Sequence, residues 1–230
     1  MWFIPMIAGL YLCIPFIKPI AVSEGKVKYY LILAFLFAFI IPETVTVVND
    51  FGNRWFIKGI NTINSTIGNV EVHMIMGYAA YFVLGYYLNK IDISKKQRMI
   101  IYLLGLAGFI LTITLSLSIT LKTQQPCGQY YGNFTVNVLM ESIAVFVWFK
   151  YRKYDKARLY PIMAKLLKYS FGAYLVHALI IELLNDLFGL NTFSFNAAVS
   201  VIIIGVIVFV ISFAISAVLN HIPILKKYVV

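Results

Sequence analysis

The sequence is poor in charge. Only 12% of its 230 residues are Asp, Glu, Lys or Arg, and only nine are acidic, whereas about a quarter of a typical soluble domain is charged. So few charges cannot cover the surface of a water-soluble fold. Because 61% of the residues are apolar and the mean hydropathy is +0.86, lipid is the solvent that suits this chain. We therefore predict an integral membrane protein.

Several motifs of enzymes and metal proteins are also missing. The two cysteines, Cys13 in an apolar run and Cys127 in a polar segment, form neither a disulfide framework nor a metal site. The sequence has no Gly-rich phosphate loop, no His-Glu-x-x-His and no Gly-x-Ser-x-Gly. The first residues lack the basic region and cleavage site of a secretory signal peptide. We expect no soluble-enzyme active site, no metal and no bound cofactor.

Apolar stretches recur along the chain, each about 20 residues long, which is the length that crosses the hydrocarbon core of a bilayer. Polar segments separate them, and no repeat or linker divides the chain. We therefore predict an all-α, polytopic transmembrane helical bundle that forms one domain over residues 1–230. It has about seven spans, at 2–22, 28–48, 71–89, 98–120, 134–150, 167–188 and 198–220.

Basic residues gather between these stretches and give the chain its net charge of +10. This is the positive-inside pattern of cytoplasmic loops, and we expect no nucleic-acid partner. The loops predicted to face the cytoplasm are 90–98, 150–168 and the C-terminus. Those predicted to face outside are 49–70, 121–133 and 189–197. Within the first of these, residues 49–63 mix polar and aromatic side chains, which is typical of an interfacial helix.

An ionisable side chain inside a span costs about 2.5–3.5 kcal/mol on insertion scales, so it indicates a buried partner or a function. His177 lies midway along the predicted span 167–188. Ser170, Tyr174 and His177 follow helical spacing and share one face. This face either binds substrate and handles protons or makes interhelical hydrogen bonds. Glu141 lies about 10 Å from the outer end of its span, and is either a general base or the partner of a basic residue.

Other polar and small residues favour structural interpretations. Five ionisable residues lie nearer the outer ends of spans, where contact with water explains them: Glu43, Glu71, His73, Glu182 and Asp186. Small residues within spans allow helices to approach closely. These are Gly77, Gly85, Gly105, Gly108, Ser212 and Ser216.

Four segments together resemble the acyltransferase 3 family of bacterial membrane acyltransferases. They are WFIPMIAGLYLCIPFIKPI (2–20), GYAAYFVLGYYL (77–88), YGNFTVNVLMESIAVFVWFK (131–150) and SFGAYLVHALI (170–180). The resemblance implies a multi-pass protein of the bacterial cytoplasmic membrane with a cytoplasmic C-terminus. It also implies transfer of an acyl group, often acetyl, from acyl-CoA to a hydroxyl of a surface polysaccharide or lipid-linked glycan.

The resemblance implies one feature that the chain lacks. Family members carry an Arg followed by a His in their first helix, and that His is expected to act as general base. No such pair stands near Met1, so we expect this chain to be the C-terminal part of a longer domain, whose activity as it stands is open. His177 matches a different family position and does not inherit that role.

The resulting hypothesis assigns roles to named residues. Ser170, Tyr174 and His177 line the substrate path, and His177 and Glu141 are the candidate catalytic groups. The phosphates of acyl-CoA meet a set of basic residues by charge attraction, namely Lys95, Lys96, Arg98, Arg152 and Lys153. Two other functions stay open: a transporter or flippase with Glu141 and His177 in a proton relay, and a non-catalytic component of surface-polymer assembly.

Overall fold

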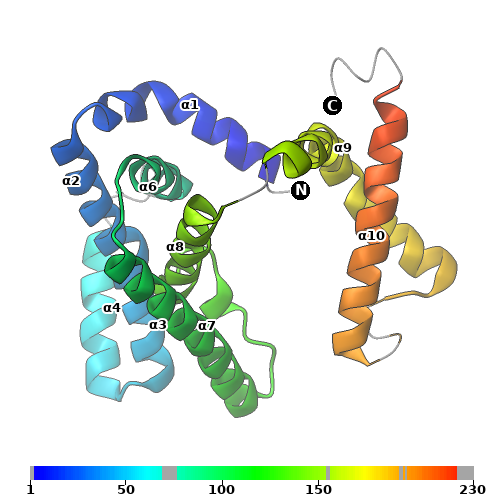
Figure 1. Ribbon diagram of the computed structural model, residues 1–230. Coiled ribbons are helices and arrows are strands. Elements are labelled where there is room, and N and C mark those ends of the chain that lie inside the picture. Colours follow the sequence, from blue (N-terminus) through cyan, green and yellow to red (C-terminus); the bar gives the residue numbers. More distant parts are fainter. Residues whose placement is uncertain (1–2, 69–76, 154–155, 192–193, 195, 222–230) are drawn as a thin grey trace. The chain divides into compact units, whose positions relative to one another are not determined.

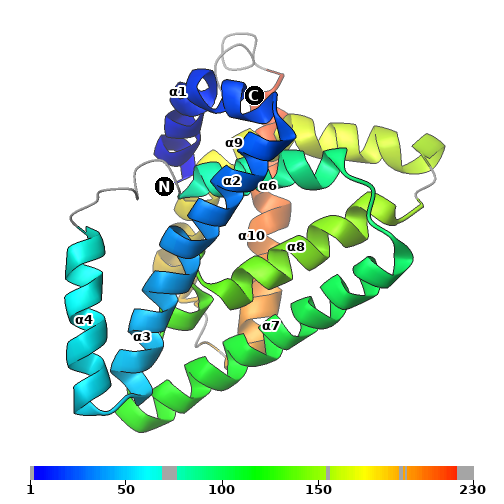
Figure 2. The same ribbon diagram turned by 90° about the vertical axis from the view of Figure 1, so that its left-hand side faces the viewer.

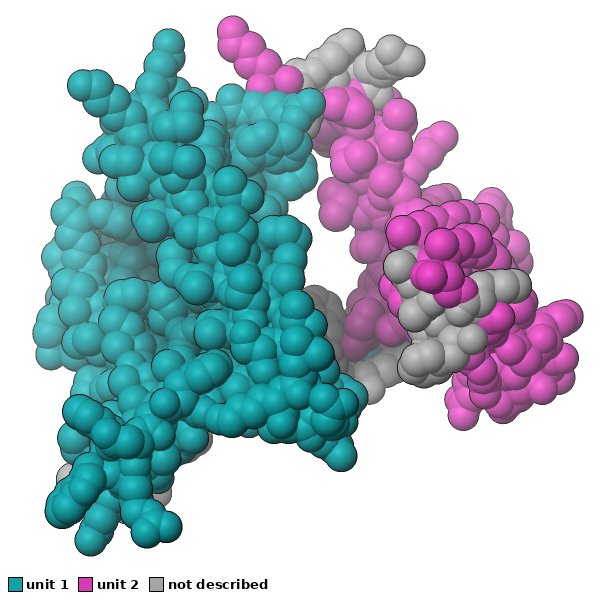
Figure 3. Space-filling view, turned by 90° about the horizontal axis from the view of Figure 1, so that it is seen from below, with its two compact units in different colours: residues 1–152 teal, residues 153–230 magenta. Residues whose placement is uncertain are grey.

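The structure is a computed structural model that describes residues 3–68, 77–153, 156–191, 194 and 196–221 (Figure 1). Within these ranges every regular element is a helix, which confirms the all-α prediction. The chain divides into two compact units, residues 1–152 and 153–230, coloured separately in Figure 3. The single domain over residues 1–230 stays a prediction. Glu71, His73, Lys226 and Lys227 lie outside the described residues.

The first unit contains most of the helices. In chain order they are α1 (Phe3–Ala21), α2 (Glu24–Ala34), the π-helical turn η1 (Phe35–Ile40), α3 (Ile41–Phe51), α4 (Arg54–Gly68), α6 (Tyr78–Lys90), α7 (Lys95–Thr123), the 3-10 turn η2 (Gln129–Tyr131) and α8 (Val136–Tyr151). The second unit contains α9 (Lys156–Phe188) and α10 (Ala197–Leu219). Because η1 has no break at either end, α2 and α3 form one continuous rod.

Six of the seven predicted spans coincide with helices that are long and apolar enough to cross a membrane. These cover Ile4–Ala21, Glu24–Phe51, Lys95–Thr123, Gln129–Tyr151, Leu159–Phe188 and Val199–Leu219. The seventh, 71–89, begins in residues 71–76, outside the described residues. Its remainder is α6, whose 13 described residues are shorter than a crossing.

Large apolar side chains cover much of the exposed helix surface, the reverse of a water-soluble fold. On α7, for example, Leu103, Leu106 and Leu117 are each more than half exposed. Lipid tails can contact such a surface without the cost of exposing it to water. With the six candidate spans, this makes the chain a multi-pass membrane protein.

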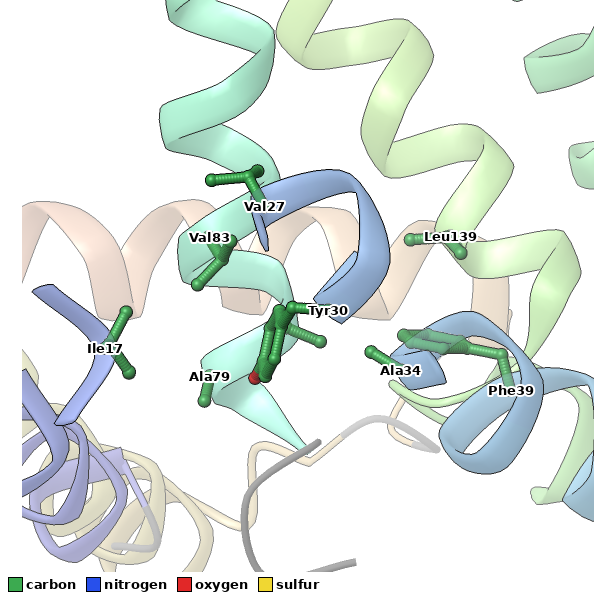
Figure 4. Packing of buried hydrophobic residues seen from close by; sticks show 9 residues of the cluster. Ile17, Val27, Tyr30, Ala34, Phe39, Ala79, Val83 and Leu139 are labelled. Atoms are coloured by element: carbon green, nitrogen blue, oxygen red, sulfur yellow. The ribbon is translucent and has the colours of Figure 1, made fainter. Parts of the chain in front are cut away.

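The core of the first unit joins α1, α2, η1, α6 and α8. Figure 4 shows Tyr30 of α2 beside α6, near Ala79 and Val83. Small side chains allow these helices to approach, since Ala34, Ala79 and Ala80 are all buried. This packing sets α6 and α8 against the rod made by α2 and α3.

Helices α7 and α8 run antiparallel and pack closely along their length (Figure 2). A Cβ added at Gly105 would lie 2.3 Å from Ala144 Cβ, and one added at Gly108 would lie 2.6 Å from the Asn137 carbonyl oxygen. The prediction of close packing is therefore confirmed at these two glycines. At Gly77 and Gly85 an added Cβ would meet described atoms only at 3.5 and 4.0 Å, which is ordinary contact, so glycine is not required there.

In the second unit, α9 and α10 also meet at small residues. Ser216 Oγ donates a hydrogen bond of 2.8 Å to the Tyr169 carbonyl, and a Cβ on Gly172 would lie 2.3 Å from the same Oγ. Ser212 is buried beside this contact, so both serines lie where close packing was predicted. The predicted loop 150–168 is wrong, because α9 already begins at Lys156. A hydropathy pattern detects only the apolar part of a helix that crosses the bilayer. Residues with high helix propensity, here Ala, Arg, Leu, Met and Lys, can extend the same helix beyond the bilayer.

The predicted helix in residues 49–63 exists as α4, but it does not stand apart from the bundle. Gly52 and Asn53 turn the chain after α3, and α4 returns beside α3 (Figure 2). The side-chain amides of Asn49 and Asn61 exchange hydrogen bonds of 3.4 and 3.2 Å across the pair. The helix therefore forms a hairpin with the end of a candidate span.

Candidate functional site

Glu43 of α3 caps the start of α8. Its Oε2 accepts a 2.7 Å hydrogen bond from the backbone N–H of Val136, the first residue of α8. Thr135, the residue in the capping position, makes no side-chain bond to that helix. A carboxylate placed there satisfies a free N–H group and meets the positive end of the helix dipole. Glu43 is thus a half-buried packing partner rather than the solvated interfacial residue that we predicted.

The C-terminal end of α3 is fastened to the connection between α7 and α8. Tyr130, whose side chain is fully buried, donates a hydrogen bond of 2.7 Å to Asp50 Oδ2. Lys122 Nζ donates one of 2.8 Å to the Asp50 backbone oxygen. We refer to this end of the first unit, with α3, η2 and the start of α8, as the polar end.

A chain of hydrogen bonds leads from the polar end into the packed interface of α7 and α8. Asn137 Nδ2 donates to the Tyr130 carbonyl and to Thr112 Oγ1, both at 2.6 Å. Thr112 Oγ1 in turn lies 2.6 Å from Glu141 Oε1, to which it donates. No Lys or Arg among the described residues forms an ion pair with Glu141, so its partner is a hydroxyl instead of the basic residue we considered.

Two cavities at the polar end share Glu43 in their walls. The first, of about 200 Å³, is lined mainly by polar and aromatic residues, including Glu43, Thr46, Gln129, Tyr130, Asn133 and Phe134. We call it the polar cavity. The second, of about 340 Å³, lies between α3, α7 and α8 and is mostly aliphatic, with Glu43, Thr44 and Asn137 as its polar members. We call it the aliphatic cavity.

The opposite end of the first unit is basic. Lys150 Nζ donates to the Leu88 and Asn89 carbonyls at 2.8 and 3.0 Å, and also to that of Ile91. A cation at that position compensates the negative C-terminal end of α6. Next to it, Tyr151 accepts a 2.6 Å hydrogen bond from the Ile93 N–H. We call this region the basic end.

The predicted phosphate-binding residues meet at the basic end, with one exception. Lys95 and Lys96 are exposed in the first turn of α7, which Ser94 and Gln97 close with a reciprocal capping box. Arg98 lies 4.2 Å from the centre of the Tyr151 ring, and its buried Nε has no hydrogen-bond partner. Arg152 lies over Trp148 at 4.4 Å. Lys153 is exposed and belongs to the second unit.

The predicted stripe of Ser170, Tyr174 and His177 lies on α9, and two of its members bond to their own helix. Ser170 Oγ donates to the Leu167 carbonyl at 2.8 Å, and His177 Nδ1 bonds to the Tyr174 carbonyl. Because a carbonyl only accepts, this contact is a hydrogen bond in the tautomer that carries the proton on Nδ1, which leaves Nε2 as the second ring nitrogen. The Tyr174 and His177 rings lie 5.1 Å apart. Glu182 and Asp186 further along are exposed.

Among the described residues, no group of three or more His, Cys, Asp and Glu side chains is arranged to hold a metal ion. Glu141 belongs to the first unit and His177 to the second. Asn137, Gln129 and the cavities beside Glu43 were not predicted from the sequence. The signal that could have identified Asn137 is its place in a predicted membrane span, because a buried amide there needs hydrogen-bond partners.

Comparison with known proteins gives one match. A family model described as an acyltransferase domain, that of acyltransferase 3, matches residues 1–221. No curated protein and no solved structure matches the chain.

Proposed function

The chain belongs to the acyltransferase 3 family, and from this premise we propose that it transfers an acyl group, typically acetyl, from acyl-CoA to a hydroxyl of a surface polysaccharide or another cell-envelope acceptor. The family and the six candidate spans make it a membrane acyltransferase. The proposal adds the donor, the acceptor and an orientation. The basic end and the C-terminus face the cytoplasm of a bacterium, where acyl-CoA is made.

The arrangement of cations around the start of α7 is the observation that carries this proposal. Lys95 and Lys96 project from the first turn of a 29-residue helix whose N-terminal dipole also favours anions. Arg98 is oriented by stacking on Tyr151, a geometry that pre-organises its remaining N–H groups. The phosphates of a coenzyme A thioester are a suitable ligand for such a site.

The reaction requires one proton acceptor. The oxygen of the acceptor hydroxyl attacks the thioester carbonyl carbon, the C–S bond breaks, and coenzyme A leaves as a thiolate that takes up a proton. A general base removes the hydroxyl proton. His177 offers Nε2 for this purpose because Nδ1 is held by Tyr174, and Glu141, hydrogen-bonded to Thr112, is the second candidate.

Replacing Lys95 and Lys96 together by glutamine tests the donor site. We expect the KM for acetyl-CoA to rise roughly tenfold with little change in kcat, because phosphates contribute binding but no chemistry. The measurement is transfer of radiolabelled acetyl groups to glycan by membranes that contain the protein expressed from its complete gene. Lys58→Gln, which removes an exposed cation of α4, is the matched control. Substrate uptake into vesicles without acetyl transfer would instead favour a transporter.

Replacing His177 by alanine should lower kcat for acetyl transfer by about 10²–10⁴-fold, the typical contribution of a general base, without lowering the protein level. His221→Ala is the control, because His221, just after α10, also bonds through Nδ1 to a backbone carbonyl, that of Ala217. If both variants transfer acetyl like the wild type, His177 is not the base. Glu141→Gln is then the next variant to assay.

A further inference from the structure

We propose that the polar cavity binds the acceptor, and that the acceptor is a neutral carbohydrate whose hydroxyl groups bond to Glu43 and Gln129. This inference rests on the proposed function and adds the place and chemical class of the second substrate. Both residues line the cavity. They come from α3 and η2, so the polar end brings together parts of the chain that are far apart in sequence.

Both side chains have hydrogen-bonding capacity that the protein does not use. Glu43 Oε2 accepts from Val136, while none of the hydrogen bonds within the described residues reaches Oε1, whose lone pairs accept from hydroxyls. Gln129 is exposed, and its amide likewise bonds to no described group. Thr46 Oγ1 donates to the Pro42 carbonyl at 3.0 Å and keeps its own lone pairs. The cavity wall thus presents several acceptors and one amide donor, which suits hydroxyl groups.

In the wall of the adjoining aliphatic cavity, one buried amide side chain has an oxygen that accepts no hydrogen bond. Asn137 is 1% exposed, and its Oδ1 has no hydrogen-bond partner. The amide cannot be turned round to remove the problem, since the Tyr130 carbonyl only accepts and therefore requires Nδ2 beside it. Such a buried acceptor without a donor is rare in proteins and calls for a ligand or water. Glu43 lines both cavities and Asn137 lines the aliphatic one, so the two cavities share a wall that contains unused hydrogen-bonding capacity.

An aromatic wall completes the polar cavity and is held rigidly. The Phe134 ring lies 4.8 Å from that of Tyr78 and 6.1 Å from that of Phe39. Asn133 fixes the same segment, since its carbonyl accepts from Tyr81 Oη at 2.6 Å and its Nδ2 donates to Tyr78 Oη at 2.7 Å. A sugar ring presents apolar C–H faces and polar edges, so a rigid ring beside free polar groups matches both.

Other ligand classes fit the polar cavity less well. A phosphate would meet the Glu43 carboxylate, and the described residues of the wall include no Lys or Arg. The nearby Lys122 is already bonded to the Asp50 backbone. A lipid tail would leave Glu43 and Gln129 without partners, at the cost of burying polar groups in hydrocarbon.

Binding of simple sugars tests the assignment without any need for catalysis. The probes are the methyl glycosides of glucose, galactose and N-acetylglucosamine, added to the protein in lipid nanodiscs and followed by saturation-transfer NMR. We expect at least one to bind, and Gln129→Leu combined with Glu43→Gln to weaken it at least tenfold. A glutamine at 43 still accepts from Val136, so the cap of α8 persists. Gln129→Leu alone removes no bond of the fold, and we expect it to weaken binding by several-fold.

Gln125→Leu is the matched control, because Gln125 is an exposed neighbour in the same connection that does not line the polar cavity. Failure of all three sugars to bind the wild type, or equal binding by the double variant, would overturn the assignment. Sugar binding by a protein that transfers no acetyl group would support the cavity and refute the proposed function. Acetyl transfer with an unchanged KM for the glycan in the double variant would refute the cavity alone.

Discussion

Replacing Gly105 by alanine should lower the melting temperature of the solubilised protein by about 6–12 °C. The added methyl group would lie 2.3 Å from Ala144 Cβ, so α7 and α8 would have to separate along their contact. Overpacking of this kind costs about 3 kcal/mol, and each kcal/mol corresponds to roughly 2–4 °C for a chain of this size. Recovery of monodisperse protein after heating, followed by size-exclusion chromatography, measures the shift.

A second substitution shows whether that contact is the cause. Ala144→Gly added to Gly105→Ala removes the clashing atom and should restore most of the melting temperature, less the cost of one more helical glycine, about 0.5–1 kcal/mol. Gly205→Ala is the control, since a Cβ there would have no atom within 4 Å. Equal melting of Gly105→Ala and Gly205→Ala would mean that α7 and α8 do not pack as described.

Replacing Lys150 by methionine should also destabilise the protein, by about 3–12 °C at roughly 2–4 °C per kcal/mol. Methionine keeps most of the length of the side chain but removes every donor to the carbonyls of Leu88, Asn89 and Ile91. Hydrogen bonds from a charged group contribute about 1.5–3 kcal/mol, and the end of α6 would lose its compensating cation. The same heating assay applies, with proteolysis of the segment after α6 as a local measurement.

Lys150→Arg keeps the charge and the donors and should retain most of the stability. Lys96→Met removes an exposed cation of the same end and should leave the melting temperature within about 1 °C. A Lys150→Met protein as stable as Lys96→Met would show that Lys150 does not cap α6. Lys150 donates hydrogen bonds to three backbone carbonyls and is in this sense a structural cation. Lys95 and Lys96 differ, because neither forms an ion pair with a described acidic residue.

Much of the fold could be predicted because membrane crossing imposes a length and an apolar composition on each helix. Gly105, Gly108 and Ser216 were likewise recognisable as contacts, since only small residues let helices meet so closely. The roles of Glu43 and Lys150 were not predictable. Their partners are the backbone N–H of Val136 and the carbonyls at the end of α6, and backbone groups carry no identity in a sequence. Asp50 and Tyr130 form a hydrogen bond although 80 positions separate them in the sequence. No helix or strand periodicity predicts a contact over such a separation.

Only one part of the candidate site, the cluster of cations, could be recognised in the sequence. Clustered cations at Lys95, Lys96 and Arg98 stand out in a chain with so few charges, and the structure places them at one helix start. The cavities at the polar end were missed because their walls come from α3, η2, α7 and α8. A single polar residue in each of several helices does not indicate a shared site in the sequence, because only the assembled helices bring these residues together.

The length of α8 has a consequence for the route of the acyl group. This helix joins the polar end, where Glu43 holds its first residue, to the basic end beside Lys150. Its 16 residues correspond to about 24 Å at 1.5 Å per residue, against a hydrocarbon core of about 30 Å. On the two proposed assignments, a donor bound by its phosphates at the basic end and a sugar bound at the polar end would be separated by most of the bilayer. The proposed transfer would then require the thioester to cover that distance, and the reach of the donor's flexible arm would limit turnover.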